Sequence, residues 1–463
     1  PNSIFKTISS TGIYILGSNS RADVQYLVYL GVSHRSRRPY LFAQFVHPIF
    51  CRFEMTIQPR QTTNIVSRLQ GMQDQSEETL RQKQGLQERL SQLLGGYGYL
   101  QLETPLLEPT ELFMRKSGGE LASQLYSFTD AGSNSVSLRP EFTSPIMRHY
   151  LESESTIDLP ARWQYSGPVF RFDNSHPDAS GQFTQVGGEL IGSSKIAADV
   201  EVLNLAVAVP TKLGLEGWSL RLADLDILNS LLDSVGISDR ARLFIIQSMP
   251  NLKTGRSAVP NFLDEGRHMH LVGGVNGSAD PEDAALRRAI DGLDDTQARS
   301  VLLGLLQWNS ADQLGQRTPE DVVERLLQKI KGSDNEDKLR QGLELASDLA
   351  AINGTPGQAL QMVKETLASA GADQAAADRL GEVIGLMSSG SEATGQIVLD
   401  FGLVHGLAYY NGVIFEVSHP KWTGTLGGGG RYDTLSRALG GSDAVPALGF
   451  AYNLDALIAI GAS

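Results

Sequence analysis

Residues 400–433 read DFGLVHGLAYYNGVIFEVSHPKWTGTLGGGGRYD, and this stretch guides our prediction of the fold. Residues 397–399 and 413–417 are apolar or β-branched runs of strand length. The run of four glycines that follows allows a backbone to approach another group closely, because glycine has no Cβ. Polar groups between two buried strands are typical of a pocket floor. We therefore predict that Tyr409, Tyr410 and the glycine run line a ligand pocket.

The composition is that of a globular protein with two or three domains: 463 residues, of which 41% are hydrophobic and 20% charged. The formal net charge of -13 argues against a broad nucleic-acid surface, although a local basic groove stays open. Cys51 is the single cysteine, which excludes an internal disulfide and suits a reducing compartment. No apolar run reaches membrane-spanning length. We expect a cytoplasmic protein that does not contact a membrane.

Residues 1–54 differ from the rest of the chain. They begin at Pro1, are rich in Ser and Arg, and have only Asp23 and Glu54 as acids. We favour an upstream extension of the reading frame, with Met55 as the true start. A cleaved targeting segment is the alternative, because such segments are rich in Arg and Ser and poor in acids.

Several secondary-structure elements are predicted from local patterns. A helix should begin after Ser76 and stop at Gly95 and Gly96, and a strand should follow over 97–102. Residues 125–138 predict a hairpin, and residues 145–150 the start of a helix. Residues 222–394 predict a mainly helical insertion between two halves of a core, 55–221 and 395–463. Within it, His268 and His270 are weak metal candidates, since a third ligand is missing, and we expect no metal.

Two polar groups predict chemistry. Arg139, Glu141 and Thr143 have period-two spacing, which would place them on one side of an extended backbone, where Glu141 could pair with an ammonium. An Arg139–Glu141 salt bridge in a loop is the alternative. Residues 162–192 predict an antiparallel hairpin in which Arg171, Gln185 and Glu189 point inward.

The order of the motifs GMQD, ETPLLEP, LRPEFT, GPVFRFD, QFTQVGGELIG, GLAYYNGVIFEV, GGGGRYD and ALGFAYNLDAL resembles the catalytic core of histidyl-tRNA synthetase, a class II synthetase. The resemblance covers residues 71–191 and 395–460. The regulatory subunit of ATP phosphoribosyltransferase, which acts in the first step of histidine biosynthesis, shares this core. The resemblance implies an α+β fold in which helices flank an antiparallel sheet.

The resemblance also implies a pocket for histidine. In the synthetases, the residues that match Glu141, Thr143 and Gln185 bind the α-ammonium, and those that match Glu189 and Tyr410 contact the imidazole. The full set that we assign to a histidine-like pocket is Glu141, Thr143, Arg171, Gln185, Glu189, Tyr409, Tyr410, Gly428, Gly429 and Arg431.

The catalytic residues that the resemblance implies are partly missing. His405 stands where the synthetases have a catalytic arginine, Ala408 replaces an aspartate, and Ala456 replaces the arginine that contacts adenine and the γ-phosphate. A neutral histidine cannot make the bidentate contact of a guanidinium. Only 13 residues follow Phe450, so we also expect no anticodon-binding domain and no tRNA substrate.

We therefore predict a non-catalytic regulatory subunit of ATP phosphoribosyltransferase. It would need no cofactor, dimerise near Pro105, bind the catalytic subunit, and take histidine as an effector. A synthetase-like enzyme that activates an amino acid with ATP, and an adaptor with a vestigial pocket, remain the alternatives.

Overall fold

The computed structural model describes part of the chain: residues 13–16, 27–30, 66–115, 118–172, 181–269, 271–272, 290, 293, 295–309, 323, 334–388, 395–403 and 409–462. It has two compact units, Pro1–Val66 and Ser67–Ser463. In the first, β1 (Ile13–Leu16) pairs with β2 (Leu27–Leu30) in antiparallel fashion. The rest of the predicted extension, 1–54, lies outside the described residues.

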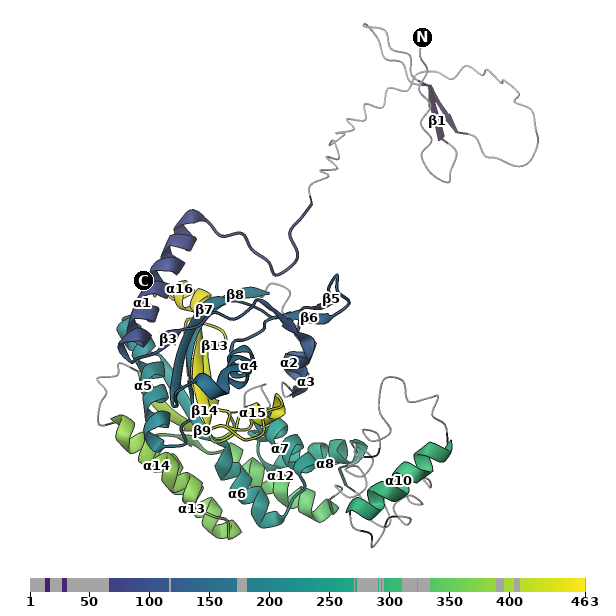
Figure 1. Cartoon of the computed structure of the whole chain (residues 1–463), viewed down its shortest axis with the longest axis vertical. Helices are drawn as coiled ribbons and strands as arrows, with labels where there is room; N and C mark the ends of the chain where they lie inside the picture. The colour runs from purple at the N-terminus through teal and green to yellow at the C-terminus, as the bar shows by residue number, and fades with distance from the viewer. Residues whose placement is uncertain are drawn as a thin grey trace, which may run out of the picture. The chain divides into compact units, whose positions relative to one another are not determined.

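The second unit is built on a sheet of nine described strands (Figure 1). Their order across the sheet is β10 (Asn353–Gly354), β11 (Gln396–Asp400), β9 (Ser219–Asp224), β12 (Val413–Ser418), β13 (Thr425–Arg431), β14 (Ala447–Asn453), β8 (Gln182–Ile191), β7 (Ala161–Phe170) and β3 (Leu100–Gln101). A second sheet of three described strands has the order β4 (Leu107–Pro109), β6 (Ser135–Leu138) and β5 (Ser127–Thr129). The predicted hairpin over 125–138 is thus present as β5 and β6.

Neighbouring strands of the large sheet are antiparallel except for two pairs, β11 with β9 and β3 with β7. Strand β10 comes from the segment that we predicted as an insertion, and it completes one edge of the sheet. Strand β9 continues past the predicted core boundary at residue 221. The division of this unit into a core and an insertion stays a prediction.

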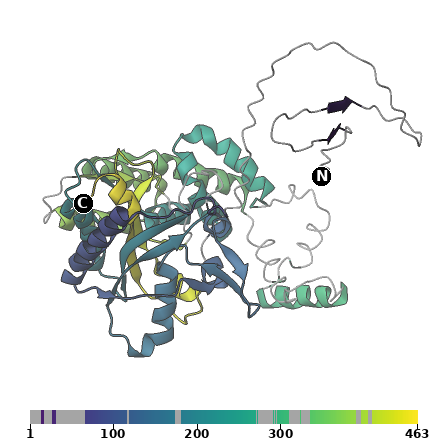
Figure 2. The same cartoon turned by 90° about the horizontal axis from the view of Figure 1, so that it is seen from above.

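Helices cover the sheet on both sides (Figures 1 and 2). Those around the strands are α1 (Glu77–Gly96), α2 (Thr110–Met114), α3 (Gly118–Ser123), α4 (Thr143–Ser153), α5 (Ile196–Lys212), α15 (Leu435–Ala438) and α16 (Leu454–Ala459). Those between β9 and β11 are α6 (Leu225–Val235), α7 (Asp239–Leu252), α8 (Val259–His268), α10 (Asp295–Asn309), α12 (Glu336–Ala350), α13 (Pro356–Ala370) and α14 (Ala375–Ser388). The predicted α+β fold with flanking helices is confirmed.

Helix α1 begins where the sequence predicts it. The Ser76 side chain accepts a hydrogen bond from the backbone N–H of Thr79 at 3.2 Å, which satisfies one of the free donors at the helix start. Leu86, Leu90 and Leu94 form its buried face. The following strand is shorter than predicted, because only Leu100 and Gln101 pair with a neighbour.

Two hydrophobic clusters hold the sheet from its opposite faces. Successive strand residues alternate between the faces, so Leu448 belongs to the larger cluster and Ala447 to the smaller one. The larger cluster joins the sheet to α1, α5 and the helices between β9 and β11. The smaller one joins β7 to α4 and includes Tyr409 and Tyr432. Polar side chains that point into this smaller layer are surrounded by aromatic rings.

Candidate functional site

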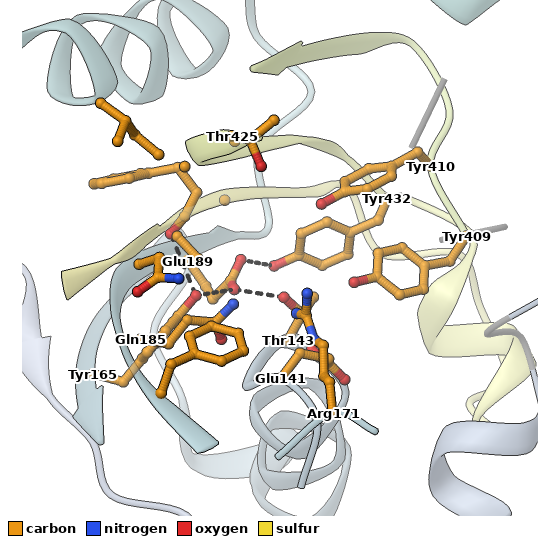
Figure 3. Close-up of a pocket in the computed structure, with 18 residues that line it drawn as sticks. Glu141, Thr143, Tyr165, Arg171, Gln185, Glu189, Tyr409, Tyr410, Thr425 and Tyr432 are labelled. Carbon is orange, nitrogen blue, oxygen red and sulfur yellow. Dashed lines mark hydrogen bonds between the residues drawn. The ribbon is translucent and has the colours of Figure 1, made fainter. Parts of the chain in front are cut away.

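The β7–β8 hairpin positions three of the polar side chains of the site. Its two strands pair in register from Ala161 with Ile191 to Phe170 with Gln182, which confirms the predicted hairpin. Gln185 and Glu189 are four residues apart on β8 and therefore point to the same face. They line the same cavity, together with Arg171 just beyond the end of β7 (Figure 3).

Glu189 is the most buried acid of the site, with 1% of its surface exposed. Its Oε1 accepts hydrogen bonds from Thr143 Oγ1 at 2.8 Å and from the Tyr165 hydroxyl at 3.2 Å, and its Oε2 accepts one from the Tyr432 hydroxyl. Burial raises the pKa of Glu189 to about 8, although these hydroxyl groups oppose the shift. Three hydroxyl groups therefore fix this carboxyl before any ligand arrives (Figure 3).

Glu141 lies beside the first turn of α4. Both of its carboxyl oxygens accept the backbone N–H of Ser144, at 3.1 and 3.2 Å. Burial raises its pKa, while the Ser144 hydrogen bonds and the charge of Arg171 lower it. The N-terminus of a helix and a nearby cation both favour an ionised carboxylate, which suits Glu141 for an ammonium ligand.

Arg139 departs from the prediction that it shares one side of the chain with Glu141 and Thr143. Its guanidinium donates to the carbonyl oxygens of Thr104, at 2.6 Å, and Pro168, at 3.0 Å. Thr143 is already the first residue of α4, so the backbone is not extended through all three residues. The alternative, a salt bridge between Arg139 and Glu141, is also absent from the described contacts.

Tyrosine rings form the opposite wall of the cavity. The rings of Tyr409 and Tyr410 are 4.9 Å apart between centroids, and Tyr432 meets Tyr409 edge-on at 6.0 Å. Burial raises the pKa of both the Tyr409 and the Tyr410 hydroxyl above the usual value of a tyrosine, so both remain neutral hydrogen-bonding groups. His405 and Ala408, which precede this wall in the chain, lie outside the described residues.

Gln185 and Arg171 provide the remaining polar atoms. The Gln185 Oε1 atom is buried and has no hydrogen-bond partner among the described residues. Arg171 donates from Nε to the Pro140 carbonyl at 2.9 Å and lies over the Phe183 ring at 5.4 Å. A buried acceptor without a partner is costly, so Gln185 favours a ligand that brings a hydrogen-bond donor.

The cavity that these residues enclose has a volume of about 170 Å³. Eight of the ten predicted ligand-binding residues line it: Glu141, Thr143, Arg171, Gln185, Glu189, Tyr409, Tyr410 and Gly428. The charged side chains of this lining are one cation, Arg171, and two carboxyl groups, those of Glu141 and Glu189. The cavity thus favours a small ligand with hydrogen-bond donors and a positive group.

Gly429 and Arg431 do not line this cavity. A Cβ on Gly429 would lie 2.1 Å from the backbone oxygen of Gly449, so this glycine permits the close approach of β13 to β14. The Arg431 guanidinium donates to Asp199 Oδ1 from Nη2 at 2.6 Å and from Nε at 3.0 Å. Asp199 lies on α5, which packs behind the sheet against β14.

Gly427, the first of the four glycines that we predicted to line a pocket, is also in the lining. The remaining lining residues were not predicted from the sequence, namely Tyr165, Phe183, Thr425, Leu426, Tyr432, Gly449, Phe450, Ala451 and Asn453. Tyr165 could have been predicted from the sequence, because it lies two residues after Trp163 on β7 and so shares the face of the strand that carries this large aromatic residue. Gly449 could not, since its role is steric: a Cβ there would lie 1.6 Å from Glu189 Oε2.

The described residues contain neither a metal site nor a membrane-spanning helix. They contain no group of three or more His, Cys, Asp or Glu side chains with the arrangement of a metal site. Within the same residues, no helix is long and apolar enough to cross a membrane. His270, one of the two weak metal candidates, lies outside them.

The mainly antiparallel sheet with its flanking helices and buried polar pocket defines a class II synthetase-like protein. A family model described as histidyl-tRNA synthetase matches residues 71–252 and 307–457. The chain belongs to the histidyl-tRNA synthetase family.

Its curated relatives include archaeal enzymes named histidine–tRNA ligase. That of Pyrococcus abyssi is 28% identical over 398 residues, which cover 86% of this chain and 75% of the relative. That of Pyrococcus furiosus is 29% identical over 398 residues, with the same coverage.

Solved structures show the same fold. An ATP phosphoribosyltransferase regulatory subunit/histidyl-tRNA synthetase from Bacillus halodurans matches with a TM-score of 0.58 and 20% identity, over 86% of this chain and 83% of that one. A histidine–tRNA ligase subunit from Alicyclobacillus acidocaldarius matches with a TM-score of 0.52 and 21% identity, over 86% and 97%. At these identities the likeness concerns the fold alone.

Proposed function

We propose that this protein is a non-catalytic regulatory subunit of ATP phosphoribosyltransferase that binds histidine in the pocket described above. The observation that carries the proposal is the pairing of a retained amino-acid pocket with the loss of cationic side chains expected for nucleotide chemistry. Membership in the histidyl-tRNA synthetase family makes histidine the first candidate ligand. The name of the Bacillus halodurans neighbour includes this regulatory role beside that of a histidyl-tRNA synthetase.

The pocket chemistry matches free histidine at both ends of the ligand. Glu141 and Gln185 Oε1, which has no hydrogen-bond partner in the described part of the chain, suit the three donors of an α-ammonium group. Glu189 and the Tyr410 hydroxyl suit the ring nitrogens of an imidazole. A cavity of about 170 Å³ is smaller than the roughly 300–1,000 Å³ of pockets for drug-sized ligands, which favours one amino acid.

The nucleotide end of the site supports a role without catalysis. Ala456 is fully buried in the larger hydrophobic cluster, where the family resemblance places an arginine that meets the γ-phosphate. Its backbone N–H donates to Asn453 Oδ1 at 3.1 Å. Each missing charged hydrogen bond to a phosphate removes about 1.5–3 kcal/mol, so the substitutions together argue against ATP-dependent activation.

Reconstitution tests the regulatory role. The protein is mixed with a short-form catalytic ATP phosphoribosyltransferase, and phosphoribosyl transfer is followed with and without histidine. We expect a stable complex whose activity falls when histidine is added. Failure to form a complex, or inhibition that is independent of this protein, would contradict the proposal.

A histidine–tRNA ligase is the second candidate, because the archaeal relatives with that name match 86% of the chain. ATP–pyrophosphate exchange with histidine separates the two roles. We expect no exchange above background. Exchange at the rate of a working synthetase would establish the enzyme and would show that the missing arginines are not required.

We further propose that the protein dimerises through the surface near Pro105. Leu100, Leu106 and Leu107 flank this proline and expose 69%, 47% and 41% of their surfaces in the single chain. Apolar side chains that gather on a surface favour an interface with a second copy.

A further inference from the structure

Arg431 has a role that the pocket does not explain. It is 5% exposed, and its guanidinium faces away from the cavity toward α5. Besides Asp199, it contacts the Ser193 carbonyl at 3.2 Å and Asp433 Oδ1 at 3.1 Å, both through Nη1. A buried cation needs such partners, but these partners also connect it to the next segments of the chain.

Asp199 receives a second arginine from a distant part of the sequence. Arg379 on α14 donates from Nη2 to Asp199 Oδ2 at 2.5 Å and to the Ser194 carbonyl at 3.0 Å. Asp199 is fully buried, whereas the Arg379 side chain is 35% exposed. Helix α14 packs against α5 (Figure 1). Through its two arginine partners, Asp199 therefore bridges the helices between β9 and β11 to the end of β13.

The same network reaches the tyrosine wall of the pocket. The Arg431 carbonyl accepts the backbone N–H of Asn411 at 2.8 Å, and the Asn411 side chain accepts the backbone N–H of Asp433 at 2.7 Å. Asn411 directly follows Tyr410. These bonds therefore hold the Tyr410 backbone against the end of β13.

Tyr432 is the second point of attachment. It follows Arg431 directly, and strand alternation turns its side chain to the opposite face, where its hydroxyl donates to Glu189. Its backbone N–H donates to the Ala447 carbonyl at 2.8 Å. A change in the Arg431 position must therefore move a residue that fixes the buried carboxyl of the pocket.

We propose that Arg379 is a positioning residue for the ligand pocket, acting through Asp199 and Arg431 on Tyr410, Asn411 and Tyr432. This inference rests on the proposed histidine site and adds a route by which the helices between β9 and β11 set its affinity. Arg431 alone already pairs with Asp199, so charge neutralisation does not require Arg379. What Arg379 adds is a connection, through hydrogen bonds, between α14 and the tyrosine wall of the pocket, formed by Tyr409, Tyr410 and Tyr432.

Hydrogen exchange tests this connection between Arg379 and the tyrosine wall without any ligand. In Arg379→Ala, the backbone amides of Asn411, Tyr432 and Asp433 should exchange roughly two- to thirty-fold faster, the range by which mutations along a coupling network act. Arg379→Lys keeps one donor for Asp199 and should restore part of the protection. Arg256→Ala is the matched control, because it removes a partly exposed ion pair between the α7–α8 connection and Asp348 of α12, and none of its described contacts is with a residue of the network.

Calorimetry with histidine gives the second readout. Arg379→Ala should weaken histidine binding by roughly two- to thirty-fold, and Arg256→Ala should leave it unchanged. In the double variant that carries Arg379→Ala and Asn411→Ala, the fold loss in histidine affinity should be smaller than the product of the two single losses, because both residues act on the same path. If the wild-type protein does not bind histidine, only the proposed function is overturned, because hydrogen exchange tests the positioning role of Arg379 without a ligand. Unchanged exchange in Arg379→Ala would overturn the positioning role.

Discussion

Glu189 shows how burial and hydrogen bonds compete at a single carboxyl group. It is buried among aromatic rings, which raises its pKa to about 8, and its three hydroxyl donors only partly offset this. Near neutral pH the group therefore holds a proton for much of the time, so it can donate as well as accept a hydrogen bond. A ligand with either tautomer of an imidazole could be accommodated.

Glu189→Gln should change how stability depends on pH. The folded pKa of about 8 lies above the usual value of 4.5 for a free glutamate. The stabilisation from the proton is therefore complete below the lower value and is lost as pH rises through the upper one. The unfolding free energy of wild type, relative to the variant, should fall by about 3–4 kcal/mol between pH 5 and 8.

Chemical denaturation of both proteins across this range measures the effect. All other titrating groups are common to the two proteins, so the difference isolates Glu189. A difference that is constant with pH would show that Glu189 is ionised throughout, and that the hydroxyl groups outweigh its burial.

Not every site residue could be assigned from the sequence. Gln185 and Glu189 were found because spacing along a strand determines the face on which they lie. Arg431 does not line the cavity, and the sequence could not indicate this, because Arg431 follows four glycines, which have no side chains to indicate the buried face. Only the position of Asp199, 232 residues away in the chain, decides where its guanidinium points.

Strands β8 and β14 approach each other more closely than side chains would permit. A Cβ on Gly187 would lie 2.1 Å from the Phe450 carbonyl oxygen, which is backbone and cannot move aside. This contact lies where the two strands pair in the cavity floor. The close approach brings the Glu189 carboxyl next to β14.

Gly187→Ala should therefore destabilise the protein by about 1–3 kcal/mol, the usual cost of overpacking. Gly85→Ala is the matched control: Gly85 lies on the exposed side of α1 with open space around its Cβ position. That variant should be more stable than wild type by about 0.5–1 kcal/mol. Thermal and denaturant unfolding measure both, and a neutral Gly187→Ala would contradict the proposed steric constraint.

The secondary elements differ in how well local patterns predict them. The α1 helix and the β7–β8 hairpin follow from a cap, a periodic face and a turn, all of which are local. Strand β10 has only two residues, Asn353 and Gly354, and exists because β11 is there to pair with it. Such long-range pairing leaves no signal in a short stretch of sequence.

At the scale of the molecule, the family and the fold class follow from the order of several motifs, while the partners do not. A dimer near Pro105 makes a prediction that can be checked in solution. Leu107→Glu places a charge within the exposed apolar surface, which should convert dimers to monomers.

Light scattering at matched concentrations measures the mass. Leu386→Glu is the control, because Leu386 is 49% exposed on α14 and lies far along the chain from Pro105. It should leave the mass unchanged. A monomeric wild type, or a Leu107→Glu variant that remains dimeric, would show that the chain does not dimerise through this surface.

The most direct test of the account is a calorimetric titration of the purified protein with L-histidine in the absence of ATP. We predict one binding event per chain, weakened about ten- to a hundred-fold in Glu141→Gln, because the variant loses a charged hydrogen bond to the ammonium group. Glu77→Gln, an exposed change in the first turn of α1, should bind as wild type does. Absence of binding by the wild-type protein, or equal binding by Glu141→Gln, would contradict the claim that this pocket holds histidine.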